Sequence, residues 1–236
     1  MFKDIMLQEA KASGIVLSEE QICSLTKYYE LLIEWNQKMN LTALTEPHDV
    51  ALKHFCDSIL LLSYADIPYG SSLIDVGTGA GFPSIPIKIV RPDIELCLLD
   101  SLNKRLVFLS DVVIDLNLSD VTIIHSRAED GAKDKKLREA FDFATSRAVA
   151  QLNVLSEYCL PYVKVGGAFL AMKGKYSEEE IANSKNAIKT LGGKISKVDT
   201  YNLSDGSERT IINIAKLSST DKAYPRTSAK IKSKPL

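Results

Sequence analysis

Apolar side chains are arranged along the chain in two different patterns. In residues 22–39 they follow the spacing of an amphipathic helix, and Ser18 with Gln21 forms the sequence pattern of a capping box before it. A second helical pattern begins at about Asp49. From Ser71 onward, short apolar runs alternate with helical segments, as in sheets whose parallel strands are connected through helices. The pattern predicts a helical N-terminal part followed by an α/β sheet.

The strand-like runs end in a pair that differs from the others. A loop with Ser-Asp-Gly-Ser at its centre joins the last two runs, and a loop this short favours an antiparallel hairpin over a crossover helix. We therefore expect a mainly parallel sheet that closes with an antiparallel pair. The predicted strands are 72–76, 94–99, 121–124, 141–145, 168–172, 195–201 and 209–215, and the helices between them include 103–116, 149–162 and 177–191.

Composition narrows the class of protein. A hydrophobic fraction of 45%, a charged fraction of 25% and a mean hydropathy of -0.01 are typical of a globular protein without a membrane span. The first residues lack the apolar core of a signal peptide. The four cysteines form no CxxC pair, and their apolar or helical surroundings are typical of buried reduced thiols. We expect a cytoplasmic protein with no metal site and no disulfide.

The charge is unevenly distributed although the formal net charge is only -1. Several cations and no acidic residue lie in the last fifteen or so positions, and Tyr224 adds an aromatic ring beside them. Charge alone leaves two interpretations open, a nucleic-acid contact and a solvated basic tail. The cations are Lys222, Arg226, Lys230, Lys232 and Lys234.

A glycine-rich loop follows the first predicted strand. Gly77, Gly79 and Gly81 alternate directly after an apolar run and before a helix, where a tight turn lets the backbone approach a ligand. Dinucleotide enzymes tend instead to show GxGxxG with pyrophosphate at the helix start. Asp75 stands two positions before the first glycine. Its negative charge suits a ligand that carries an amino-acid ammonium and a sulfonium, and it suits the anionic pyrophosphate badly. Such a loop can also be a turn without a ligand.

Acidic residues at the ends of the next two strands favour a nucleoside ligand. Asp100 ends the second strand, where a carboxylate accepts hydrogen bonds from ribose hydroxyls. Ala128 and Glu129 follow the third strand, close to where an adenine is commonly held in such folds. Together with the glycine loop, these positions predict S-adenosylmethionine as the cofactor and a Rossmann-like class I methyltransferase fold.

The motifs resemble one family along nearly the whole chain, the bacterial 16S ribosomal RNA guanine-N7 methyltransferases known as RsmG or GidB. Ser84 departs from the family pattern, which usually has glycine there, and we expect Ser84 to serve the helix start. Ala229-Lys230-Ile231 also stands where a glycine is common. The resemblance rests on Asn40-Leu41-Thr42, His54 with Asp57-Ser58, DVGTGAGFPSIPIKIVRP from Asp75, Asp100-Ser101, Lys104-Arg105, Arg127-Ala128-Glu129, FDFATSRAVAQL from Phe141, Gly166-Gly167, Ala171-Met172-Lys173-Gly174 and Tyr224-Pro225-Arg226.

The resemblance implies site residues position by position. Arg147 is the most informative, because it follows the fourth predicted strand at the ligand edge of the sheet, and we take it as the catalytic residue; a structural arginine is its alternative. The implied cofactor contacts are Gly77, Phe82, Asp100, Ser101, Ala128, Glu129 and Arg147, to which the loop adds Asp75 and Gly79. The implied guanine or RNA contacts are Arg105, Lys173, Arg209 and Arg226, with Arg147 again among them.

The implied reaction needs no general base, because guanine N7 carries a lone pair and no proton. Catalysis then rests on alignment, which can contribute several kcal/mol. The fourth strand is not followed by the Asn-Pro-Pro-Tyr motif that many amino-group methyltransferases use. The catalytic cysteine pair expected for methylation at carbon 5 is not evident either. We assign no chemistry to His48, His54 and His125.

We expect a monomer that acts on 16S ribosomal RNA or the small ribosomal subunit, away from membranes. Residues 1–66 would form a helical extension packed on the core, 67–218 the S-adenosylmethionine-binding core and 219–236 a basic tail. Two alternatives stay open: a methyltransferase for another RNA or a small molecule, and an assembly factor that retains the fold.

Overall fold

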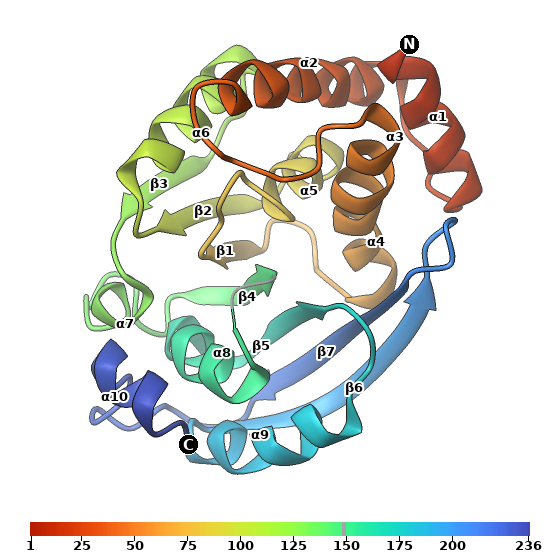
Figure 1. Ribbon diagram of the computed structural model, residues 1–236. Helices are drawn as coiled ribbons and strands as arrows, with labels where there is room; N and C mark the ends of the chain where they lie inside the picture. Colours follow the sequence, from red (N-terminus) through yellow and green to blue (C-terminus); the bar gives the residue numbers. More distant parts are fainter. Residues whose placement is uncertain (148–149) are drawn as a thin grey trace.

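The computed structural model describes residues 1–147 and 150–236. Its centre is a seven-stranded sheet in the order β3-β2-β1-β4-β5-β7-β6 (Figure 1). The first five strands run parallel, and β7 lies antiparallel to both β5 and β6. The predicted sheet and its antiparallel end are confirmed. The strands are β1 Ser72–Val76, β2 Glu95–Asp100, β3 Val121–His125, β4 Phe141–Arg147, β5 Val163–Lys173, β6 Gly193–Asn202 and β7 Glu208–Lys216.

Helices cover both faces of the sheet. Successive side chains of a strand point to opposite faces, so Leu73 joins the core under the N-terminal helices while its neighbour Ile74 joins the core under the C-terminal helices. The first face carries α1 Phe2–Ala12, α2 Glu19–Asn36, α3 Pro47–Val50, the π-helix η1 Ala51–Cys56, α4 Asp57–Tyr64, α5 Ser84–Val90 and α6 Asn103–Asp115; the second carries α7 Ala128–Gly131, α8 Leu152–Cys159, the 3-10 helix η2 Leu160–Tyr162, α9 Glu178–Thr190 and α10 Ser228–Ser233.

The N-terminal helices differ from the prediction in their ends. The capping box of Ser18 and Gln21 is present at the start of α2. The predicted helix continued to residue 39, but α2 ends at Asn36. The Asn36 side chain accepts hydrogen bonds from the backbone N–H groups of Leu41 (2.8 Å) and Thr42 (3.0 Å), which turns the chain out of the helix. The pattern also missed α1.

The predicted helix over 149–162 begins at a residue that lies outside the described ones. The α-helical part is Leu152–Cys159, and the 3-10 turn that follows contains Pro161, which lacks the N–H that an α-helix would use. The strand that comes next is longer than predicted and starts at Val163. Gly167 allows β5 to approach β4 closely at this point, since a Cβ there would lie 2.2 Å from the carbonyl oxygen of Asp142.

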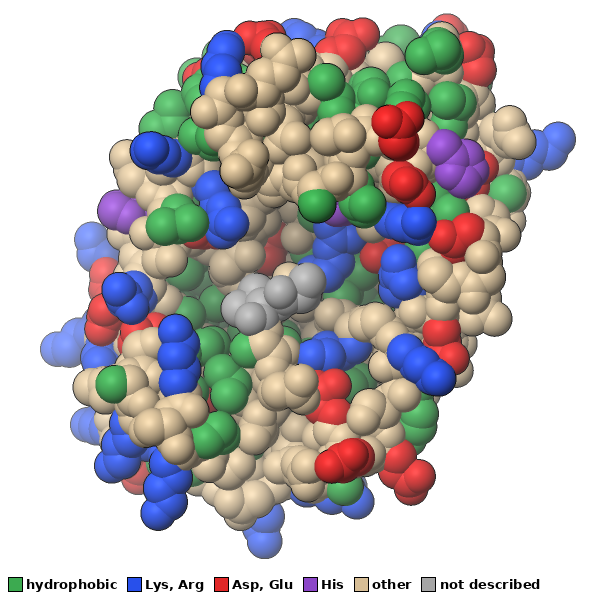
Figure 2. Space-filling model, viewed as in Figure 1, with side chains coloured by type: hydrophobic (Ala, Val, Ile, Leu, Met, Phe, Trp, Pro, Cys, Tyr) green, Lys and Arg blue, Asp and Glu red, His purple; other side chains and the backbone are tan. Residues whose placement is uncertain are grey.

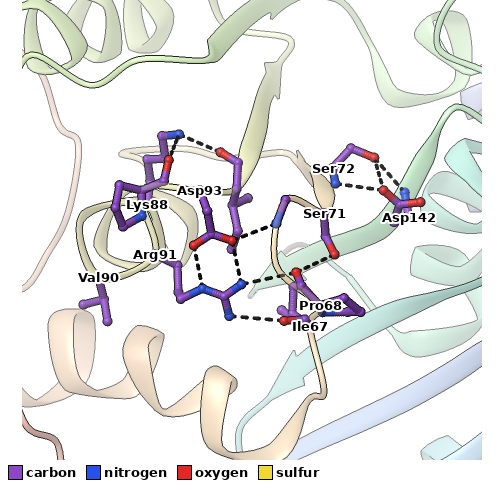
Figure 3. Close-up of polar contacts among 12 residues, drawn as sticks. Ile67, Pro68, Ser71, Ser72, Lys88, Val90, Arg91, Asp93 and Asp142 are labelled. Carbon is purple, nitrogen blue, oxygen red and sulfur yellow. Dashed lines mark hydrogen bonds and ion pairs between the residues drawn. The ribbon is translucent and has the colours of Figure 1, made fainter.

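The segment between α4 and β1 is anchored at the edge of the sheet where β1 begins (Figure 3). Arg91 donates to the carbonyls of Ile67 and Pro68, both at 3.2 Å, and forms two 2.7 Å bonds to Asp93. The buried Lys88 donates to the carbonyl of Ile94 at 2.6 Å. The predicted division of the chain at residues 66/67 and 218/219 stays a prediction. The helices α1, α2 and α4 share one apolar core with the sheet.

The cysteines correct one expectation. Cys56, Cys97 and Cys159 are buried, as expected, but Cys23 is exposed on α2. Across residues 1–147 and 150–236, no helix is both long and apolar enough to cross a membrane, and no group of three His, Cys, Asp or Glu side chains is placed to hold a metal ion.

Candidate active site

A cleft of about 930 Å³ opens at the carboxyl ends of β1, β2 and β4, the edge where open α/β sheets bind ligands. Figure 2 shows a hollow on this face with Lys and Arg side chains around it. Most of the predicted site residues meet in the cleft. Its walls include Gly77, Gly79, Phe82, Asp100, Ser101, Arg105, Ala128, Glu129 and Arg147.

The glycine loop has the tight conformation that its sequence predicts. Gly77, Gly79 and Gly81 all have positive φ, at 76°, 61° and 91°, a region that side chains with a Cβ rarely adopt. Tyr28 from α2 donates a hydrogen bond to the carbonyl of Ala80. A Cβ on Gly81 would lie 2.7 Å from the Tyr28 hydroxyl. The N-terminal helices therefore hold the loop directly.

Asp100 connects the loop to the end of β2. Its Oδ2 accepts from the backbone N–H of Gly79 (2.9 Å), its Oδ1 accepts from that of Leu102 (2.8 Å), and Arg105 lies 3.4 Å away. The side chain is almost completely buried yet lines the cleft. An ionised carboxylate can accept about four hydrogen bonds. Gly79, Leu102 and Arg105 use three of them, so Asp100 keeps acceptor capacity on Oδ1 for one ribose hydroxyl.

Asp75 lies in β1 and is fully buried, and it is not part of the cleft wall. Its Oδ2 accepts from the Thr78 hydroxyl at 2.8 Å, whereas its Oδ1 has no hydrogen-bond partner among the described residues. Burial raises the pKa of Asp75 to about 7. A cation bound above the loop would favour the charged carboxylate.

Ser84 does not cap the start of α5, contrary to the expectation that it serves the helix start. It is the first residue of α5, but the N-cap position is Pro83, and the buried Ser84 hydroxyl makes no capping hydrogen bond. The helix therefore starts without a side-chain cap. The Ser84 hydroxyl acts instead on the Asp75 carboxyl, whose pKa it lowers against the larger effect of burial.

Arg147 ends β4 and points its guanidinium at the N-terminal helices. Nη1 donates to the carbonyl of Lys53 (3.0 Å) and to Asp57 Oδ2 (3.2 Å), while Nη2 donates to His54 Nδ1 (3.1 Å). The guanidinium also lies 5.3 Å from the centre of the Phe82 ring. Lys53 and His54 belong to the π-helix η1, a type of helix frequent at functional sites.

His54 is held in one protonation state. It stacks on Phe82 with ring centres 4.5 Å apart, and burial, assisted by the charge of Arg147, lowers its pKa to about 3. A guanidinium only donates, so Nδ1 is the acceptor and the proton of the neutral ring is on Nε2. The sequence alone indicated no role for His54, Asp57 or Thr42. The motifs Asn40-Leu41-Thr42 and His54 with Asp57 were the signal that could have found them.

The remaining predicted RNA contacts lie outside the cleft wall, and each has a carboxylate partner. Lys173 pairs with Glu180 at 2.7 Å, Arg209 with Asp57 at 3.2 Å and Arg226 with Glu157 at 2.6 Å. The partners of Arg209 and Arg226 are far away in the sequence, so charge patterning could not reveal these two pairs. RNA contact by Arg105, Lys173, Arg209 and Arg226 stays a prediction.

The C-terminal segment is folded against the protein. Ile231 of α10 is fully buried in the core shared with α8, and Figure 1 shows α10 beside α8. Ser228, Lys232 and Pro235 reach the cleft wall. The segment is thus anchored, but Lys222, Lys230, Lys232 and Lys234 are exposed, so both interpretations of its charge stay open.

A family profile described as GidB, rRNA small subunit methyltransferase G, matches residues 21–212. The chain belongs to the rRNA small subunit methyltransferase G family. Proteins named ribosomal RNA small subunit methyltransferase G are similar over the full length: one from Clostridium beijerinckii is 51% identical over 100% of this chain and 99% of its own, and one from Lactobacillus johnsonii is 48% identical over 100% of both. The suspected family is thus confirmed.

Solved structures support the class I fold of this rRNA small subunit methyltransferase G family member. A SAM-dependent methyltransferase from Aquifex aeolicus has a TM-score of 0.53 at 16% identity, covering 77% of this chain and 97% of its own. TYW2 of M. jannaschii, solved in complex with AdoMet, has a TM-score of 0.51 at 13% identity, covering 63% and 70%. At these identities the likeness concerns the fold alone, and it confirms the Rossmann-like methyltransferase architecture.

Proposed function

We propose that this protein transfers a methyl group from S-adenosylmethionine to N7 of a guanine in the 16S RNA of the small ribosomal subunit. Membership of the rRNA small subunit methyltransferase G family supports the reaction type and the RNA. The observation that carries the N7 assignment is the state of His54, the only titratable base at the Arg147 end of the described cleft wall.

The lone pair of His54 Nδ1 is occupied by the Arg147 guanidinium, so this histidine is unsuited to removing a proton from a substrate. Methylation at N7 requires no such removal. The N7 lone pair forms the new bond to the methyl carbon, the carbon–sulfur bond breaks, and its electron pair stays on sulfur. S-adenosylmethionine, when bound, supplies the electrophilic methyl group.

The residues of the cleft fit this cofactor. Asp100 has acceptor capacity left at the end of β2, and Asp75 has a buried oxygen without a partner beneath the glycine loop. Ala128 and Glu129 line the same cleft on the β3 side. We assign the ribose to Asp100, the adenine side to Ala128 and Glu129, and the balance of positive charge to Asp75. Arg147 then lies on the β4 side, where the substrate base enters.

The test is to map N7-methylguanosine in small-subunit RNA from cells with the gene, without it, and with an Asp100→Ala copy. We expect one N7-methylguanosine to disappear in the second and third strains. An unchanged pattern overturns the proposal. Full methylation with the Asp100→Ala copy removes the assigned cofactor role instead.

A second experiment separates the alternatives. Transfer of labelled methyl from S-adenosylmethionine to purified small-subunit RNA, to assembled subunits and to small molecules identifies the substrate class. Transfer to another RNA or only to a small molecule contradicts the proposal. Absence of transfer to any of these substrates by the wild type also contradicts it and favours an assembly factor. The monomeric state and the cytoplasmic location stay predictions. Sedimentation of the purified protein tests the monomeric state.

A further inference from the structure

Thr42 lies at the Arg147 end of the cleft, between the N-terminal helices and the sheet. Its backbone N–H donates to the Asn36 side chain at 3.0 Å, and its carbonyl accepts from the same side chain at 3.1 Å. Thr42 is half-buried and lines the cleft. Its backbone is therefore fixed by a side chain of α2, and its hydroxyl faces a defined environment.

The hydrogen bonds around the Thr42 hydroxyl can be assigned atom by atom. His54 Nδ1 accepts from Arg147, so the neutral ring carries its proton on Nε2, which lies 2.8 Å from Thr42 Oγ1. The backbone N–H of Leu44 donates to the same oxygen at 3.0 Å. Both lone pairs of Oγ1 are thus occupied, and the hydroxyl proton has no acceptor among the hydrogen bonds of the described residues.

A hydroxyl in this state acts only as a donor. Threonine hydroxyls ordinarily donate or accept and therefore do not distinguish one partner from the other. Here Arg147, acting through His54, removes the acceptor option. The hydrogen bonds from Arg147 to His54 and from His54 to Thr42 therefore make the Thr42 hydroxyl a hydrogen-bond donor at the cleft wall.

The position of this donor corresponds to the substrate side of the cleft. Asp100 ends β2 on one side of β1, and Arg147 ends β4 on the other side. With the ribose at Asp100, the Thr42 end remains for the base. On the edge that carries N7, guanine presents O6 as an acceptor, whereas adenine presents an amino donor in the same place. N7 itself must stay free to react.

We propose that the Thr42 hydroxyl donates to O6 of the target guanine and so selects guanine over adenine. Arg147 and His54 are positioning residues that hold Thr42 in its donor-only state. This inference rests on the proposed function, because it assumes that the base is methylated at N7.

The test uses small-subunit RNA in which the methylated guanine, once mapped, is replaced by 2-aminopurine, a base that keeps N7 and lacks O6. The efficiency kcat/KM is measured for both RNAs with the wild type, Thr42→Val and Thr42→Ser. Thr45→Val, at an exposed position three residues on, is the matched control. The affinity for S-adenosylmethionine is measured for each protein.

We expect the wild type, Thr42→Ser and Thr45→Val to lose about tenfold in kcat/KM when O6 is removed, the loss that corresponds to one hydrogen bond. Thr42→Val should be slower on guanine and show no further loss on 2-aminopurine. The ratio of the two RNAs is decisive, because disturbance of His54 and Leu44 in Thr42→Val slows both substrates alike. Cofactor affinity should stay within twofold in every variant.

Equal ratios in the wild type and Thr42→Val overturn the inference. So does a Thr42→Val protein whose main defect is weaker cofactor binding, since the hydroxyl would then serve the cofactor. Both results leave the proposed function intact. If the wild type transfers no methyl to N7 of guanine, the proposed function fails and this inference fails with it.

Discussion

Arg147 Nη1 lies 3.2 Å from Asp57 Oδ2, although 90 residues separate them in the chain. The same oxygen forms an ion pair with Arg209 Nε at 3.2 Å, and Oδ1 accepts a hydrogen bond from the Tyr201 hydroxyl at 3.0 Å. Asp57 belongs to α4, Arg147 to β4, and Tyr201 and Arg209 to the final hairpin. One buried carboxylate therefore joins the N-terminal helices to both the parallel and the antiparallel parts of the sheet at the edge of the cleft.

Replacement of Asp57 by asparagine should destabilise the protein and reduce methyl transfer together. Arg147 and Arg209 would lose their shared anion while remaining largely buried, and breaking one partner of a buried ion pair typically costs about 3 to 5 kcal/mol. Urea unfolding followed by circular dichroism measures the change in the free energy of unfolding.

Asp49→Asn is the matched control for this variant. Asp49 pairs with Lys53 at 2.7 Å nearby, but the pair is about one-third exposed, so its loss should cost much less than the loss of the buried Asp57 pairs. Similar losses in the two variants would mean that Asp57 does not act as a buried junction.

The glycine loop yields a prediction about shape. Gly81→Ala should destabilise the protein by more than about 2 kcal/mol, because φ is +91° and the new Cβ would lie 2.7 Å from the Tyr28 hydroxyl. Gly206→Ala shares the positive φ, +81°, but its Cβ meets nothing within 4 Å. The difference between their unfolding free energies isolates the contact with α2. Equal costs would show that the backbone angle alone matters at Gly81.

The sequence predicted the sheet better than the site. Short continuous apolar runs define strands because each strand must bury both faces under helices, and the adjacent Leu73 and Ile74 show this directly. The glycine loop and Asp100 were found because their chemistry is local. The partner of Arg147 was not found, since pairing with Asp57 depends on how α4 packs on the sheet. The same holds for Arg226 and Glu157, which meet only after the C-terminal segment folds onto α8.

Cofactor binding should depend strongly on Asp100. Asp100→Ala removes the acceptor of the Gly79 and Leu102 N–H groups as well as the predicted ribose contact, so affinity for S-adenosylmethionine should fall by roughly a hundredfold, corresponding to about 2 to 3 kcal/mol. Isothermal titration calorimetry measures this. Asp111→Ala, the same change at an exposed position of α6, should bind normally. Unchanged affinity in Asp100→Ala would refute the ribose assignment.

The pH dependence of cofactor affinity tests Asp75. Burial raises the pKa of this carboxyl to about 7, so it is mainly neutral below that pH and mainly charged above it. If its charge balances the cationic cofactor, affinity should increase as pH rises through about 7, by several-fold. His54 does not interfere, because its pKa of about 3 leaves it neutral throughout this window. Asp75→Asn should abolish the rise. An identical pH profile in both proteins would place Asp75 outside the cofactor site.

The contact between Arg226 and Glu157 changes what is expected of the C-terminal segment. Arg226 donates to both oxygens of the buried Glu157 carboxylate, including a 2.6 Å bond from Nη2. Arg226→Ala should therefore leave a buried charge unpaired, cost about 3 kcal/mol in the free energy of unfolding and release α10 from α8.

Because Ser228 and Lys232 line the cleft, Arg226→Ala should also weaken cofactor binding, in addition to any loss of RNA affinity. Lys222→Ala removes one exposed positive charge from the same segment without touching Glu157, so it reports on charge alone. Unfolding in urea, cofactor titration and RNA binding are compared for both variants. A selective RNA defect in Arg226→Ala, with stability and cofactor affinity unchanged, would show that Arg226 acts on RNA rather than by holding the segment in place.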